Sequence, residues 1–352
     1  MKKITAMILL LAMVLALAAC SGGTNADDKN TDSSEDTYTI GVLYLDQEVL
    51  LSEATAGCQA YAAEHSNVKL IEYNANKDVS TQLKQCENLI SQNVDAIALT
   101  PVDGAGCDQI INACKDAGIP LICFHAKVKG APITNILFDN VGFGKMQVDY
   151  AMEIFEKSGG DMNGTINVGI VTGKLDNQNA VERCQGYEEQ LKNYANATIV
   201  DEQVGSWNRD DAMAIAENWI TSGRDIDIIL SNNDAMAIGI SLAYANANVE
   251  RPIIIGVGGT EEGLTAILNG DFDGTVFQPA YQNGYDAIDF TVKYLNGETL
   301  EESYVTEGVL VTPETAQATL DDAEQLIRLR CTTAGRKGKS SPRKKIREKS
   351  YE

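Results

Sequence analysis

Histidine, the side chain that proteins use most often for proton transfer and zinc binding, occurs only twice in this 352-residue chain, as His65 and His125. No cysteine or histidine cluster has the spacing of a zinc site. The segment 256–261 resembles a dinucleotide-binding loop, but Glu261 stands where glycine or alanine is required, and its charge would repel a pyrophosphate. We therefore expect no cofactor and no metal, and an enzyme of unknown type is the weakest hypothesis for this chain.

Polar side chains instead follow the predicted strands, at the points where the strands end. Parallel α/β sheets bind ligands outside the carboxyl ends of their strands, so these positions define a candidate site without any motif. They are Asp46, Glu48, Asn74, Pro101, Asp103, His125, Thr172, Lys174, Trp207, Asn232, Asn233, Gly258, Gly259 and Gln278. Most of them carry hydrogen-bonding groups, and one is aromatic. The set indicates a binding site for a small polar molecule.

Short apolar runs alternate with helical patterns from Thr39 onward. Strands are predicted over 40–45, 68–73, 96–100, 120–124, 135–138, 166–171, 198–204, 226–230, 253–257 and 274–277. Helices are predicted near 51–65, 79–92, 105–117, 142–158, 179–194, 210–222, 234–247, 261–269 and 281–296. Such alternation builds parallel sheets with helices on both faces, and the strands fall into two runs of five. The predicted fold is α/β, with two similar doubly wound parallel-sheet lobes and a final strand-like stretch at 304–311.

Motifs spread over residues 38 to about 318 extend this prediction. They are Ile40-Gly41-Val42, Gly118-Ile119-Pro120, Asp139-Asn140 with Gly144, Arg183-x-x-Gly186-Tyr187, Gly270, Gln278-Pro279 and, most specific, the run from Asn232 to Gly239. Together they resemble the type I periplasmic sugar-binding proteins, the ribose and galactose/glucose receptors of ABC transporters. The resemblance implies two lobes joined by a three-stranded hinge. The N-terminal lobe would comprise residues 38–138 plus 279–307, and the C-terminal lobe residues 139–278 plus 308–320.

The resemblance also implies individual ligand-binding roles. Arg183 matches an arginine that donates to sugar hydroxyls, and Trp207 matches an aromatic residue that stacks on the apolar face of the sugar. Asn233 and Gln278 match amides that both donate and accept, while Glu48 would accept from hydroxyls. Alternatives remain open: Arg183 as a surface helix charge, Trp207 as a core residue and Glu48 as a solvated loop acid.

Some positions depart from the family pattern. His125 and Ala126 stand where relatives place Asp or Asn followed by Arg or Lys, and Gly258 replaces an expected aspartate. Leu50 and Leu51 replace an aromatic pair of the first lobe, so that one stacking wall is aliphatic. The ligand is therefore expected to be a modified or smaller sugar, a polyol or another polar metabolite.

The N-terminus has the pattern of an export signal. Lys2 and Lys3 precede an apolar run over 4–19, which is too short to span a bilayer comfortably. Small residues then lead into Cys20, and this resembles the bacterial lipobox, in which the cysteine is diacylated. We expect a signal peptide over 1–19 and a flexible lipid-anchored tether over 20–37, since that tract is almost free of apolar residues. The alternative is an ordinary cleavage site with a chance cysteine.

The net charge of −22 is unevenly distributed, because residues 328–352 hold ten basic and two acidic residues. These residues are expected to form a basic, disordered tail. The strongly acidic remainder argues against nucleic-acid binding. Apart from Cys20 there are seven cysteines at core-like positions, an odd number that favours buried hydrophobic thiols over a disulfide framework.

These features predict an extracytoplasmic substrate-binding lipoprotein of an ABC importer, monomeric and anchored to the cell membrane through the lipid on Cys20. It would bind a sugar or related small polar metabolite by hinge closure and present it to permease subunits. The alternative is a sensory receptor of the same fold that presents its ligand to a chemoreceptor or histidine kinase.

Overall fold

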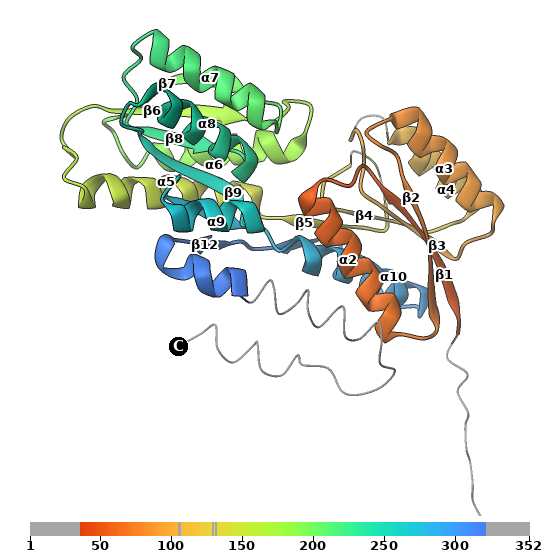
Figure 1. Ribbon diagram of the computed structural model, residues 1–352. Coiled ribbons are helices and arrows are strands. Elements are labelled where there is room, and N and C mark those ends of the chain that lie inside the picture. Colours follow the sequence, from red (N-terminus) through yellow and green to blue (C-terminus); the bar gives the residue numbers. More distant parts are fainter. Residues whose placement is uncertain (1–35, 105–106, 129, 131, 322–352) are drawn as a thin grey trace, which may run out of the picture. The chain divides into compact units, whose positions relative to one another are not determined.

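The computed structural model describes residues 36–104, 107–128, 130 and 132–321 (Figure 1). The predicted signal peptide, Cys20, nearly all of the tether and the basic tail lie outside these residues. In the described part of the chain, the strands form two six-stranded sheets. The predicted α/β fold with two parallel-sheet lobes is confirmed.

The first sheet has the strand order β11-β5-β4-β3-β1-β2, and all its neighbouring strands are parallel. Its strands are β1 (Tyr38–Tyr44), β2 (Val68–Asn74), β3 (Ala96–Leu99), β4 (Leu121–Phe124), β5 (Thr134–Phe138) and β11 (Ser303–Thr306). Helices α2 (Val49–Glu64) and α10 (Ala280–Leu295) pack against each other on one face (Figure 1). Helices α3 (Val79–Ser91) and α4 (Asp108–Ala117) cover the other face.

The second sheet has the order β12-β10-β9-β8-β6-β7. Its strands are β6 (Ile166–Thr172), β7 (Ala197–Val204), β8 (Ile228–Ser231), β9 (Ile253–Gly258), β10 (Gly274–Phe277) and β12 (Val309–Val311). One face is covered by α5 (Asn140–Lys157) and α6 (Gln178–Leu191), the other by α7 (Arg209–Thr221), α8 (Asp234–Ala247) and α9 (Glu261–Asn269). The edge strand β12 runs antiparallel to β10, whereas the other pairs are parallel.

The chain passes between the two sheets three times: after β5, after β10 and between β11 and β12. The stretch 304–311, predicted as one strand-like segment, is therefore two short strands that belong to different sheets. Gly308 lies between them, where a Cβ atom would come within 2.6 Å of the Phe143 ring. The close approach of the backbone to this ring explains why glycine stands at the crossing.

Burial on both faces accounts for the composition of the strands. All residues of β3, β4 and β8 are buried, so these strands are continuous apolar runs, with only Ser231 polar, and lack alternation. Besides the cores on the four sheet faces, a smaller cluster joins Phe138, Phe143, Val257, Val276 and Ala280 where the chain crosses between the sheets.

Most helices begin directly after a strand, and a polar side chain caps their first turn. Asp139, Asn177, Asn208, Asn233 and Thr260 each accept a hydrogen bond from a backbone N–H two or three residues later. These caps place the helix starts at the carboxyl ends of the strands, which is where the sequence predicts the ligand site.

No helix of the described residues is both long and apolar enough to cross a membrane. Over the same residues, no group of three or more histidine, cysteine or acidic side chains could hold a metal ion. The six described cysteines are free thiols, and five of them are buried.

Candidate ligand-binding site

Arg183 on α6 is buried, with 3% of its surface exposed, and its guanidinium joins three separate segments. Nε donates to Asn140 Oδ1 at 3.0 Å, and Nη2 donates to Gln278 Oε1 at 2.7 Å. Nη1 donates to the carbonyl of Asn232. Burial lowers the pKa of Arg183 to about 10, so it remains a cation at neutral pH. Two predicted ligand residues, Arg183 and Gln278, are thus in direct contact.

Trp207 lies in the turn between β7 and α7 and is the third predicted residue of this group. Its backbone is left-handed, with φ of 64°, and its indole covers Gly173, where a Cβ atom would collide with the ring. The guanidinium carbon of Arg183 lies 5.6 Å from the Trp207 ring centroid and 5.7 Å from that of Phe143. Trp207 is partly buried against the core of the second lobe and keeps part of its surface exposed.

The run Asn232-Asn233-Asp234 holds three loops of the second lobe together. Asn232 Oδ1 accepts from the backbone N–H of Gly173 at 2.9 Å. Asn233 Oδ1 caps α8 by accepting from Met236 N, and its Nδ2 donates to the carbonyl of Trp207 at 3.3 Å. This run, the most specific motif of the sequence, thereby fixes the backbone that carries Trp207.

Asp234 explains why Gly258 departs from the family pattern. Its carboxylate is buried and accepts hydrogen bonds from Thr275 Oγ1 at 2.6 Å and from Thr260 N at 2.9 Å. Burial raises the pKa of Asp234. A Cβ atom on Gly258 would lie 2.8 Å from Asp234 Oδ2, and φ of 144° there disfavours any side chain. The backbone at 258 therefore excludes the expected aspartate.

His125 follows β4 in a left-handed conformation with φ of 71°. Its backbone N–H donates to Ile136 O at 3.0 Å, and its ring meets the Phe138 ring edge to face, with centroids 5.4 Å apart. Nδ1 is shielded from solvent and has no hydrogen-bond partner among the described residues. Burial, and secondarily the charge of Arg183, lower the pKa of His125 to about 4, so the imidazole is neutral at pH 7.

Asn140 and Asn179 belong to the same network, although the sequence did not single them out as ligand residues. Asn140 Nδ2 donates to Asn179 Oδ1 at 3.1 Å, and Asn179 Nδ2 donates to the carbonyl of His125 at 3.3 Å. These bonds connect Arg183 to the loop that carries His125. Asn140 belongs to one of the family motifs in the sequence, and both asparagines lie in the first turn of a helix that begins with a capping residue.

Glu48 and Leu50, at the start of α2, have different surroundings. The Glu48 carboxylate is exposed and pairs with Lys77, whose Nζ also lies 3.4 Å from Asp46 Oδ2. Leu50 packs against the cluster that contains Phe138 and Phe143. Among the described residues, no hydrogen bond or ion pair links Glu48 to Arg183. Glu48 is therefore grouped with a lysine, and Leu50 with the apolar crossing cluster.

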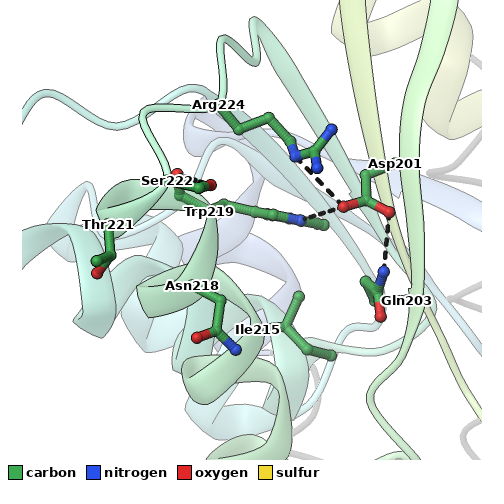
Figure 2. Close-up of a pocket in the computed structure, with 8 residues that line it drawn as sticks. All are labelled: Asp201, Gln203, Ile215, Asn218, Trp219, Thr221, Ser222 and Arg224. Carbon is green, nitrogen blue, oxygen red and sulfur yellow. Dashed lines mark hydrogen bonds and ion pairs between the residues drawn. The ribbon is translucent and has the colours of Figure 1, made fainter.

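A depression of about 460 Å³ lies elsewhere, on the second lobe between β7 and α7. Asp201 is one of the residues that line it, and Figure 2 shows its interactions with Trp219 Nε1 at 2.9 Å, Gln203 Nε2 at 2.9 Å and Arg224 Nε at 3.3 Å. Trp207 precedes α7, whereas Trp219 lies about 15 Å along the helix axis from its first residue, so the two indoles belong to opposite ends of this helix. None of the predicted ligand residues lines this depression.

Two parallel-sheet lobes, with polar side chains gathered at the carboxyl ends of their strands, define a class of protein that binds small solutes. The comparisons agree with this class. Residues 42–299 match the family model described as a periplasmic binding protein domain. The chain therefore belongs to the type I periplasmic sugar-binding protein family.

Individual relatives extend this assignment. The chain is 30% identical over 314 residues to a xylitol-binding protein of Mycolicibacterium smegmatis, covering 89% of this chain and 85% of that protein. An ABC transporter solute-binding protein from Bacillus halodurans, solved with myo-inositol, is 29% identical with a TM-score of 0.74, covering 82% of this chain and 99% of that one. The fructose-binding periplasmic domain of a hybrid two-component system is 20% identical with a TM-score of 0.75, covering 85% and 98%, and shows likeness of fold alone.

Proposed function

We propose that this chain is the extracytoplasmic substrate-binding lipoprotein of an ABC importer, and that it binds a small polyhydroxylated compound, a sugar or polyol. The observation that carries this proposal is the buried guanidinium of Arg183, held in place by Asn140, Asn232 and Gln278 beside the indole of Trp207. Such a group is built to bind, because its donors are fixed before a ligand arrives.

The hydrogen-bonding capacity of this group suits hydroxyls. A guanidinium has five N–H donors, and the network uses three, which leaves one on each terminal nitrogen for ligand oxygens. Gln278 accepts from Arg183 through Oε1, so its Nε2 group remains to donate to a ligand. Neighbouring donors of this kind match neighbouring hydroxyls on a carbon chain or ring.

Trp207 would supply the apolar contact that polyhydroxylated ligands need. The C–H face of a sugar or cyclitol is apolar, and the partly exposed indole of Trp207 can contact it. Xylitol and myo-inositol, which the names of two relatives give as their ligands, are polyols with such faces. We place the ligand of this chain in the same chemical class.

The first lobe would set the identity of the ligand when the lobes close. His125 offers a neutral Nδ1 without a partner, which a ligand hydroxyl can satisfy. Leu50 gives an aliphatic wall in place of an aromatic one. Ligand binds the closed form better than the open form, so binding shifts a hinge equilibrium toward closure.

Transport is favoured over sensing by the relatives, since the myo-inositol complex is that of an ABC transporter protein. In the alternative, a sensory receptor, the same closed form would contact a chemoreceptor or histidine kinase. Cross-linking the membrane-anchored protein in the presence of ligand separates the two, because the importer predicts permease subunits as the captured partner. Capture of a histidine kinase or chemoreceptor instead would overturn the importer.

Calorimetry with a panel of myo-inositol, xylitol, ribose, galactose and fructose tests the binding function. Trp207→Ala should weaken binding of the best ligand about 5- to 150-fold, because an apolar contact worth about 1–3 kcal/mol is lost. Arg183→Ala should weaken it at least as much, since ligand oxygens would be left unpaired. Unchanged affinity in both variants would place the pocket elsewhere.

The chain offers a matched control, because it has just two tryptophans. Trp219 is buried, donates to Asp201 and lines the depression between β7 and α7. Trp219→Phe should keep full affinity and leave Trp207 as the sole indole fluorophore, whose emission should change with ligand. Trp207→Phe should leave a Trp219 emission that does not respond to ligand.

A further inference from the structure

Two cysteines of the first lobe face each other between neighbouring helices. Cys86 lies on α3 and Cys114 on α4, and their Sγ atoms are 3.6 Å apart. Both side chains are buried, at 0% and 1% exposure, in the core between these helices and the sheet. The helices pack against each other, so the two sulfurs are held in contact by the fold itself.

Two more cysteines share this core but differ from the pair. Cys107, just before α4, and Cys123 on β4 are equally buried, and no sulfur contact within hydrogen-bonding distance is recorded for either among the described residues. Burial raises the pKa of the Cys107 thiol to about 12 and that of Cys123 well above its usual value. Within the pair, the hydrogen bond between the two sulfurs lowers the pKa of the Cys86 thiol and raises that of Cys114. The sulfur contact itself therefore distinguishes this pair from Cys107 and Cys123.

We propose that Cys86 and Cys114 form an internal disulfide when the lobe folds outside the cytoplasm, with a small-molecule or protein disulfide as the oxidant. The Cys86 thiolate attacks one sulfur of the oxidant and forms a mixed disulfide, and the first thiol leaves. The Cys114 thiolate then attacks Cys86 Sγ, and the second thiol leaves. The two cysteines lose two electrons and two protons, and the oxidant is reduced to two thiols.

The geometry needs little rearrangement for this bond. An S–S bond is about 2.05 Å long, so the sulfurs must approach each other by roughly 1.5 Å, a distance within reach of side-chain rotation. Because both sulfurs are buried, exchange takes place before α3 and α4 have closed over the core. The bond would close a loop from Cys86 to Cys114, 28 positions apart, and so constrain the unfolded chain.

The test is peptide mapping of the full-length protein purified from the cell envelope, with free thiols alkylated under denaturing, non-reducing conditions. We expect one disulfide-linked peptide pair containing Cys86 and Cys114, about 2 Da lighter than the sum of its reduced peptides. Cys58, Cys107 and Cys123 should be alkylated. Full alkylation of Cys86 and Cys114, even after refolding with oxidised glutathione, would overturn the proposal, as would linkage of either one to a different cysteine.

A stability measurement gives an independent readout. Reductant should lower the melting temperature of the wild-type protein by on the order of 5 °C or more, since the loop constraint is lost. The Cys114→Ala variant should show no effect of reductant. Cys107→Ala, the matched control in the same core, should keep the full effect. An equal response of the wild-type protein and Cys114→Ala to reductant would contradict the proposal.

Discussion

At the scale of single residues, Arg183 illustrates how a buried charge can be held by neutral groups. Its three hydrogen bonds end on two amide side chains and one backbone carbonyl, and no ion pair to it is found among the described residues. A buried cation without a carboxylate partner is costly unless its donors are satisfied. The same arrangement disfavours a cationic ligand and suits a neutral one rich in oxygen.

His125 makes stability depend on pH. Its pKa is about 4 in the folded protein against 6.5 for the ordinary side chain, so between these values the unfolded chain binds a proton that the folded protein does not. As far as His125 is concerned, the free energy of unfolding is therefore highest above pH 6.5 and falls as the pH is lowered toward 4. We expect the free energy of unfolding, measured with urea, to fall between pH 7 and 4 in both proteins. The fall should be smaller in His125→Asn than in the wild-type protein, by about 1–3 kcal/mol.

The other histidine provides the control for this experiment. His65→Asn should keep most of the wild-type loss of stability between pH 6.5 and 4, because His125 is still present. If the free energy of unfolding depends on pH in the same way in the wild-type protein and in His125→Asn, the prediction is wrong, and His125 is not the residue that makes stability depend on pH.

At the scale of elements, the fold could be predicted because its signals are local. Strand and helix bounds in the sequence pattern agree with the structure to within a few residues, since caps such as Asn208 and Thr260 stand beside the helices they begin. The stretch 304–311 was predicted as one strand-like segment, although the lobe bounds implied by the family resemblance divide it after residue 307. The apolar pattern alone does not show which sheet each half joins, and the structure has β11 in the first sheet and β12 in the second.

The candidate site could be predicted only in part. Trp207 and Gln278 were found at the ends of predicted strands and Arg183 through family resemblance, and the structure brings Arg183 into contact with both. Asn140 and Asn179 were missed, because their importance arises from the packing of two helix starts that are 39 positions apart in the sequence. Such a contact depends on tertiary structure and leaves no periodic pattern.

Asn233 combines an element-scale role with a proposed ligand role, and two substitutions separate them. Asn233→Ala should lower stability by about 1 kcal/mol, because the cap of α8 is lost. Asn233→Ser keeps an oxygen that can cap the helix, so its urea unfolding should resemble wild type. Calorimetry should show weaker ligand binding in both variants. Full affinity in Asn233→Ser would restrict Asn233 to helix capping.

At the scale of the whole molecule, the proposed anchor is a single residue, Cys20, that lies outside the described structure. Cys20→Ala should release the protein from the membrane fraction, because the acylated cysteine is lost, and fractionation followed by immunoblotting measures this. A high-salt wash removes electrostatic attachment through the basic residues of 328–352. Cys331→Ala, which changes the one cysteine of the segment 328–352, should remain membrane-bound. Retention of Cys20→Ala after the wash would contradict the lipobox.

The position of β11 and β12 has a consequence for the order in which the protein folds during synthesis. Each sheet receives its sixth strand from residues 303–311, so a nascent chain that stops earlier leaves β5 and β10 as unpaired edges. Neither lobe can therefore be completed while the ribosome is still translating the first 300 residues. Both sheets therefore depend on the same nine-residue segment, 303–311, and truncation before residue 303 would leave both lobes incomplete.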